Sequence, residues 1–99
     1  MSLGLPEPSF LVLVSLADGP KHGYAVMVDV ERLCGVRMGP GTLYGAIARL
    51  ENLRLIEPLP AEERRRPYRL TEAGAAALRT ELATLDRLAS SGIRRLAAT

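Results

Sequence analysis

The chain of 99 residues is long enough for one compact domain, and its net charge of +2 points by itself to no class of partner. It has no apolar run near the roughly 20 residues of a membrane span, and its start lacks a basic segment followed by an apolar stretch, which predicts a cytoplasmic protein with no membrane partner. A single histidine and a single cysteine, without paired carboxylates or a phosphate-binding glycine loop, predict that the chain is not an enzyme and has no metal or cofactor.

The first segment, residues 8–20, is apolar on nearly every side and is short enough for a buried strand or a helix. Pro8 is typical of a helix start and the Asp-Gly-Pro sequence at 18–20 of a stop, so a helix is favoured. A helix that is apolar all round must be covered on more than one side. We expect one side to meet the core of this chain and another to meet a partner.

The second segment, residues 21–35, has the spacing of a helix that ends at Gly35, because glycine is favoured just beyond a helix end. Asp29 and Arg32 are expected on its outer face. The residues expected to face the core are Val26, Met27, Val30, Leu33 and Cys34. Cys34 is the only cysteine, so it is interpreted as a core residue and not as part of a disulfide or a metal site.

The third segment has a tolerable cap at Gly39, a proline at the first helical position and an expected end near Leu53 or Arg54. Its apolar stripe consists of Leu43, Ala46, Ile47, Leu50 and Leu53. The opposite face consists of Thr42, Gly45, Ala48, Arg49 and Asn52. A solvated helix face usually carries glutamate and lysine, and glycine in a helix costs about 1 kcal/mol relative to alanine. The small residues on this face therefore need an explanation.

Two short strands are predicted next, over residues 55–60 and 66–71, and their prolines restrict them to a small hairpin. The segment between them ends in three consecutive arginines, in a chain whose only lysine is Lys21. These arginines are Arg64, Arg65 and Arg66. Tyr68 is expected mainly in the core, with Arg69 pointing outward.

A long final helix is predicted from Thr71, which is a suitable N-cap, with Glu72 supporting the first turn. Its apolar seam consists of Leu78, Leu82, Leu85, Ala89 and Leu96. The Ser-Ser-Gly sequence at 90–92 is expected to weaken or bend the helix, and the sequence leaves open whether it is a kink or the helix end.

Three helices followed by a hairpin and a long helix are the order of a winged helix-turn-helix, which is mainly α with a small β-hairpin. The third helix of such a fold lies in the major groove of DNA, where small outer residues let the backbone approach the bases. Gly45 and Ala48 meet this need, Thr42 and Arg49 can form hydrogen bonds, and Tyr44 flanks the same face. The arginine run falls at the hairpin tip, where a wing would meet phosphates or the minor groove.

The start of the second helix commonly lies near a phosphate in such folds, so Lys21 and Tyr24 are further candidates for DNA contact. For His22 a local hydrogen bond near the helix start is the favoured interpretation.

Two other functions stay open from the residues alone. Small helix faces also permit close packing against another helix, so the chain could be a winged-helix protein-interaction module that does not bind specific DNA sequences. Salt distinguishes the two, because arginine–phosphate contacts weaken steeply as salt rises. An enzyme is a distant third, since no catalytic constellation is visible.

Three stretches closely resemble the signature sequences of the PadR family of bacterial winged-helix transcriptional regulators. They are "GPKHGYAVMVDVE" at 19–31, "GPGTLYGAIARLENLRLIE" at 39–57 and "RRRPYRLTEAG" at 64–74, and the resemblance spans roughly residues 8 to 75. Members are typically homodimers that bind inverted-repeat DNA, often as repressors, and many release DNA on binding a small aromatic or multidrug-like effector.

The resemblance implies a winged-helix domain over residues 1–70 and a dimerisation helix over 71–99. It implies DNA roles for Thr42, Tyr44, Gly45 and Arg49, with Tyr24 as a phosphate contact. It also implies that the last helix and the first form the dimer interface. The residues assigned to that interface are Phe10, Leu13, Leu78, Leu82, Leu85 and Leu96.

The chain departs from the family pattern in three respects. Position 39 is glycine where the family often has serine, so one capping hydroxyl is absent. The wing lacks the glycine often found at its tip, and Glu62 and Glu63 occupy that neighbourhood. The chain has no tryptophan, so no stacking effector pocket is visible and the effector stays open.

Overall fold

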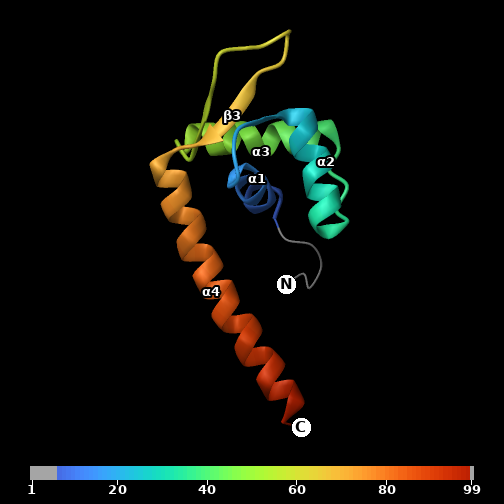
Figure 1. The fold of residues 1–99 in the computed structure, drawn as a ribbon, viewed down its shortest axis with the longest axis vertical. Coiled ribbons are helices and arrows are strands. Elements are labelled where there is room, and N and C mark those ends of the chain that lie inside the picture. Colours follow the sequence, from blue (N-terminus) through green and yellow to red (C-terminus); the bar gives the residue numbers. More distant parts are fainter. Residues whose placement is uncertain (1–6, 99) are drawn as a thin grey trace.

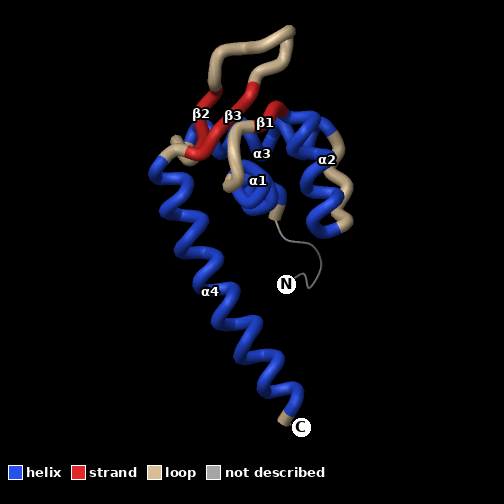
Figure 2. Tube along the Cα trace, viewed as in Figure 1, coloured by secondary structure: helices blue, strands red, loops and turns tan. Residues whose placement is uncertain are grey.

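The computed structural model describes residues 7–98 and shows a winged helix-turn-helix followed by a long C-terminal helix, as predicted (Figures 1 and 2). The elements in chain order are α1 (Pro8–Leu16), β1 (Lys21–His22), α2 (Gly23–Cys34), α3 (Pro40–Asn52), β2 (Ile56–Pro58), β3 (Pro67–Leu70) and α4 (Glu72–Ala97). Residues 1–6, where no signal peptide is predicted, and residue 99 lie outside this description. No helix within residues 7–98 is long and apolar enough to cross a membrane.

The first segment is a helix, which settles the choice that the sequence left open. Most of α1 is covered by the chain itself, because α2, α3 and α4 all pack against it. Leu11, Val12, Leu13 and Leu16 are buried, whereas Phe10 is only partly buried. The expected surface for a partner is therefore confined to the side of α1 that carries Phe10.

The second helix starts later than predicted, because Lys21 and His22 form a strand instead of its first turn. This strand, β1, pairs antiparallel with β3, so the predicted two-stranded hairpin is a three-stranded sheet in the order β1-β3-β2. Pro67 lies at the first position of the central strand, where proline is tolerated. His22 ends the strand and caps α2, since its Nδ1 accepts a hydrogen bond of 3.4 Å from the Ala25 N–H.

The core assignment of Leu33 and Cys34 is wrong. Leu33 is 58% exposed and Cys34 is exposed, because the last turn of α2 extends beyond the helices that cover its start. Gly35 then adopts a left-handed conformation with φ of 74°, and the turn brings Val36 and Met38 into the core. Asp29 is half-buried rather than outward, and its carboxylate accepts a hydrogen bond of 2.7 Å from the Ser15 hydroxyl.

Helix α3 begins with Gly39 as cap and Pro40 as first residue, as predicted, and its stripe is buried from Leu43 to Leu50. Leu53 is wrongly placed in that stripe, since it lies beyond the last turn and is 59% exposed. The chain leaves the helix through Arg54, whose φ is 59°. The Leu55 N–H then donates a hydrogen bond of 3.0 Å to the Leu50 carbonyl. This is the hydrogen bond of a Schellman-type helix end.

Helix α4 runs without interruption through residues 90–92, so the Ser-Ser-Gly sequence is not the helix end. Thr71 caps it as predicted, and its hydroxyl accepts a hydrogen bond of 3.0 Å from the Gly74 N–H. Of the described α4 residues only Gly74 and Leu78 are buried, and the rest of the helix leaves the body as an arm (Figure 1). The radius of gyration is 15.0 Å, against about 13 Å for a compact chain of this length.

Candidate nucleic-acid interface

The outer face of α3 is small, exposed and open. Thr42, Gly45, Ala48, Arg49 and Asn52 are all exposed, as the helical period predicts. A methyl group at Gly45 would meet no atom within 4 Å outside its own helix backbone. Within residues 7–98 no other helix therefore packs on this face, and the small residues do not serve a helix crossing inside the chain.

The two flanks of this face border different hollows. Thr42 and Arg49 lie toward the start of α1, where they line a hollow of about 410 Å³ together with Glu7 and Ser9. Tyr44 lies on the opposite flank. It borders a hollow of about 280 Å³ between α3, the start of α2 and the wing, lined by His22, Gly23, Tyr24, Tyr44, Arg64, Arg65, Arg66 and Tyr68.

The wing is an extended hairpin with a tight turn at its tip. Glu62 and Arg65 exchange two backbone hydrogen bonds of 2.7 Å each. The residues between them, Glu63 and Arg64, have φ of 46° and 69°. Two positive φ values in a two-residue turn are the pattern of a type I′ hairpin, which favours Asn-Gly. The glycine that the family often has at the wing tip is therefore absent where the backbone adopts the positive φ that glycine favours.

The three wing arginines keep their positive charge free of carboxylates, since none forms an ion pair within the part of the chain that the structure describes. The Arg66 guanidinium donates a hydrogen bond of 3.0 Å to the Leu59 carbonyl, which joins the two sides of the wing. The Arg65 Nη1 atom lies 3.3 Å from His22 Nε2. Glu62 and Glu63 precede these arginines without pairing with them, so the wing tip stays basic.

The structure places the ammonium of Lys21, a predicted DNA contact, against other groups of the chain. It pairs with Asp18, lies 4.0 Å from an Asp29 carboxylate oxygen and donates to the Ser15 carbonyl, and its side chain is 19% exposed. The hydrogen bond and charge of Lys21 lower the pKa of Asp18. Lys21 therefore joins α1 to α2.

The tyrosines near the wing differ in exposure. Tyr24 and Tyr44 are 63% and 52% exposed, so both can reach a ligand. Tyr68 is partly buried against the core, as predicted, while Arg69 points outward and pairs with Glu57. Burial raises the pKa of Tyr68, nearby Glu51 and Tyr44 raise it further, and Arg66 opposes them. The Tyr68 hydroxyl therefore stays protonated at neutral pH.

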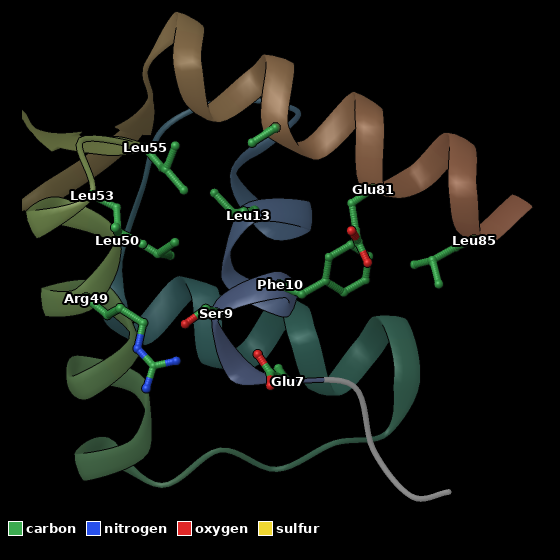
Figure 3. A pocket seen from close by; sticks show the side chains of 11 residues that line it. Glu7, Ser9, Phe10, Leu13, Arg49, Leu50, Leu53, Leu55, Glu81 and Leu85 are labelled. Atoms are coloured by element: carbon green, nitrogen blue, oxygen red, sulfur yellow. The ribbon is translucent and has the colours of Figure 1, made fainter. Parts of the chain in front are cut away.

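An apolar groove of about 640 Å³ lies between α1, the end of α3 and α4 (Figure 3). Leucines from α1, α3, α4 and the turn after α3 line it, together with Phe10 from α1, and Glu7, Arg49 and Glu81 bring charge to it. The leucines are Leu13, Leu50, Leu53, Leu55 and Leu85. The groove thus reaches from the arm to the flank of α3 that carries Arg49.

The candidate dimer residues fall into two groups. Leu13 and Leu78 are buried within the single chain, because α1 and the first turns of α4 close the core. Both are mostly covered within the single chain, although Leu13 still lines the groove beside Phe10. Phe10 is partly buried, and the apolar residues exposed along α4 are Leu82, Leu85, Leu88, Ile93 and Leu96.

Sequence reasoning missed two features of this surface. Gly41 lies on the exposed side of α3 with Gly45, and helical spacing alone could have added it to the predicted outer face. Gly23 lies against Tyr44, a contact between two helices that no local pattern signals.

The chain matches the model of the transcriptional regulator PadR-like family over residues 12–80. It is 49% identical over 82 residues to a 37.1 kDa protein in a transposon of Streptomyces fradiae, covering 83% of this chain but only 24% of that protein. It is 40% identical over 81 residues to a transcriptional regulator of Mycobacterium tuberculosis, covering 79% of this chain and 75% of that protein. Among solved structures, a transcriptional regulator from Clostridium thermocellum superposes with a TM-score of 0.75 at 26% identity, covering 88% and 89% of the two chains.

Proposed function

This chain belongs to the PadR-like family of transcriptional regulators, and we propose that it is a sequence-specific, effector-responsive repressor that binds an inverted repeat as a homodimer. The observation that carries the proposal is the small, open outer face of α3 beside three wing arginines, none of which pairs with a carboxylate of residues 7–98. A major groove admits a helix most closely where its outer side chains are small, and unpaired arginines beside it supply phosphate contacts.

Each part of this surface has its own role in the proposal. Arg49 and Thr42 read base edges or phosphates from one flank of α3, and Gly45 lets the backbone approach. Tyr44 and Tyr24 donate hydroxyl hydrogen bonds to phosphates on the other flank. Arg64, Arg65 and Arg66 bind the backbone or the minor groove next to the α3 site, with Arg64 the most available because its side chain has no partner among residues 7–98.

We propose two functional units in the chain, the winged-helix part over residues 1–70 and the dimerisation helix over 71–99. The arm of α4 carries exposed leucines that a second copy would cover, together with the groove beside Phe10. Two copies related by a two-fold axis would present two α3 helices to the half-sites of an inverted repeat.

The same groove supports the effector part of the proposal. Its volume of about 640 Å³ lies within the range of small-molecule sites, and such sites are mainly apolar with a few polar groups. A small aromatic molecule bound there would lie against the end of α3 and near Arg49. Repression would then be relieved by a shift of α3 relative to DNA.

A Gly45→Glu variant tests the proposed DNA surface. A carboxylate on this face would meet DNA phosphates and bases at close range, so affinity for duplex DNA should fall at least about 30-fold, since like charges across an interface cost several kcal/mol. Leu33→Glu is the matched control, because Leu33 is exposed at the far end of α2. Fluorescence anisotropy on a labelled duplex measures both variants.

The experiment also separates DNA binding from a protein-interaction module. Binding of the parent protein must weaken steeply as salt rises, because arginine–phosphate contacts release counterions. If Gly45→Glu and Leu33→Glu bind duplex DNA equally well, α3 is not the DNA-facing helix and the proposal fails.

A further inference from the structure

Gly23 fits tightly against the ring of Tyr44. It is the first residue of α2 and is buried, although it stands at the edge of the DNA-facing surface. A methyl group at this position would lie 2.5 Å from the Tyr44 hydroxyl oxygen, 2.9 Å from Cζ and 3.0 Å from Cε1. The absence of a side chain at Gly23 therefore makes the space that the end of the tyrosine ring fills.

Space, and not backbone conformation, is what requires glycine at this position. Gly23 does not have the positive φ of Gly19 or Gly35, so its backbone suits any L-residue. Alanine also has a higher helix propensity than glycine. The contact with Tyr44 is thus the feature of Gly23 that alanine would disturb.

We infer that Gly23 is a positioning residue for DNA recognition, because it seats the Tyr44 ring so that its hydroxyl faces a DNA phosphate. The inference rests on the proposed DNA-binding function. Tyr44 is 52% exposed and its hydroxyl has no hydrogen-bond partner within residues 7–98. It borders the same hollow as Tyr24 and the wing arginines, where a phosphate would find several donors together.

The seat matters because Tyr44 is a long, half-exposed side chain on the flank of the recognition helix. A free ring would sample other rotamers, some of them over the outer face of α3, and binding would have to select one of them. Contact with Gly23 removes this freedom before DNA arrives, and such preorganisation improves affinity without adding a contact. The same contact joins α2 to α3, so it fixes the position of the hydroxyl relative to both helices.

Nuclear magnetic resonance of the free protein tests the seat itself, without DNA. The parent should show nuclear Overhauser contacts between the Gly23 α protons and the Tyr44 ring protons. In Gly23→Ala the ring signals of Tyr44 should shift, because the methyl group displaces the ring. Absence of the contacts in the parent, or unchanged ring signals in the variant, would overturn the seat whatever the DNA measurements show.

A double-mutant cycle tests whether the contact between Gly23 and Tyr44 contributes to the affinity for duplex DNA. Gly23→Ala should lower affinity for a random-sequence duplex about tenfold when Tyr44 is present, and less than about twofold in a Tyr44→Ala background. Tyr44→Phe should lose most of the same affinity, since it keeps the ring and removes the donor. Equal loss in both backgrounds would mean that Gly23 acts on α2 alone and would overturn the inference.

The resonance experiment and the double-mutant cycle distinguish a failure of this inference from a failure of the proposed function. A parent protein that binds no duplex even at low salt would refute the DNA-binding proposal and the role of the seat in it. The resonance contacts would still show whether Gly23 seats Tyr44 in the free protein.

Discussion

Arg49 is the side chain on which base recognition depends most in this account. It lies on the flank of α3 beside Thr42, exposed and without an ion pair in the described part of the chain. Arg49→Ala should therefore weaken binding to the specific site by about 1–3 kcal/mol if the guanidinium reads a base edge. Titrations on specific and random duplexes, compared by anisotropy, measure this loss.

The control for Arg49 is Arg32→Ala, which removes an exposed arginine from the outer side of α2. It should leave affinity nearly unchanged. Equal loss for Arg49→Ala on both duplexes would assign Arg49 to a phosphate instead of a base.

Backbone strain at the wing tip can be tested at a single residue. Glu63 has φ of 46°, a conformation that costs an ordinary L-residue about 1–2 kcal/mol and that asparagine tolerates better. Glu63→Asn should thus raise the free energy of unfolding by about 0.5–1 kcal/mol, as measured by denaturant titration. Glu62→Asn removes the same charge one residue earlier, where φ is not positive, and should give no such gain. A gain of equal size from both variants would rule out backbone strain as the cause.

At this scale the sequence predicts which side chains face outward on α3, because one helical period decides it. It does not predict the fate of Lys21. The ammonium is held by oxygens of Ser15, Asp18 and Asp29, and these come together only when α1 and α2 pack. A charged residue near a predicted DNA surface looks free in the sequence until its carboxylate partners are located in space.

The joint between α3 and α4 decides how the arm is held relative to the recognition helix. The Thr71 hydroxyl donates a hydrogen bond of 2.7 Å to the Arg54 carbonyl, and the Thr71 N–H donates one of 3.1 Å to the Leu55 carbonyl. Gly74 packs so closely that a methyl group there would lie 1.9 Å from the Leu55 carbonyl oxygen. Backbone therefore meets backbone at this joint, with no flexible side chain to absorb a change.

Two glycines of the same helix provide a matched prediction. Gly74→Ala should lower the free energy of unfolding by about 3 kcal/mol, because the methyl group collides with the Leu55 backbone. Gly92→Ala should raise it by about 0.5–1 kcal/mol, since a methyl group at Gly92 meets nothing within 4 Å and alanine favours a helix. Circular dichroism during denaturation measures both, and a change of the same sign in both variants would contradict the close joint.

The elements themselves are largely predictable, and the two points at which the sequence falls short have physical reasons. β1 has only two residues, Lys21 and His22, and exists because β3 offers them a partner far away in sequence. The sequence left open whether Ser-Ser-Gly ends α4, and the helix continues through it, because a penalty of about 1 kcal/mol for one glycine is small against a helix of 26 residues.

The whole molecule is a compact winged helix with an arm, measuring 55 × 27 × 23 Å. The wing and the free end of α4 lie at opposite ends of it (Figure 1). Helix α4 has 26 residues and is about 39 Å long, and its arm exposes an apolar side to solvent in a single chain. A second copy covering that side would complete the core and set the distance between two α3 helices.

The dimer predicted by this shape should depend on the exposed leucines of the arm. Leu82→Glu combined with Leu85→Glu should convert it to a monomer in sedimentation or light-scattering measurements, because two buried carboxylates without partners cost several kcal/mol. Ala76→Glu combined with Ala83→Glu is the control, since these exposed residues lie on the other side of α4. A dimer that survives the leucine substitutions would place the interface elsewhere.

The most direct test of the account is the affinity of the purified protein for duplex DNA from the region upstream of its own gene, against a random duplex, at low and near-physiological salt. Fluorescence anisotropy should show tighter binding to the upstream duplex, with both affinities falling as salt rises, since base contacts add specificity to a salt-dependent phosphate term. Binding to neither duplex at low salt, or affinities that do not change with salt, would contradict a DNA-binding role for the small face of α3 and the basic wing.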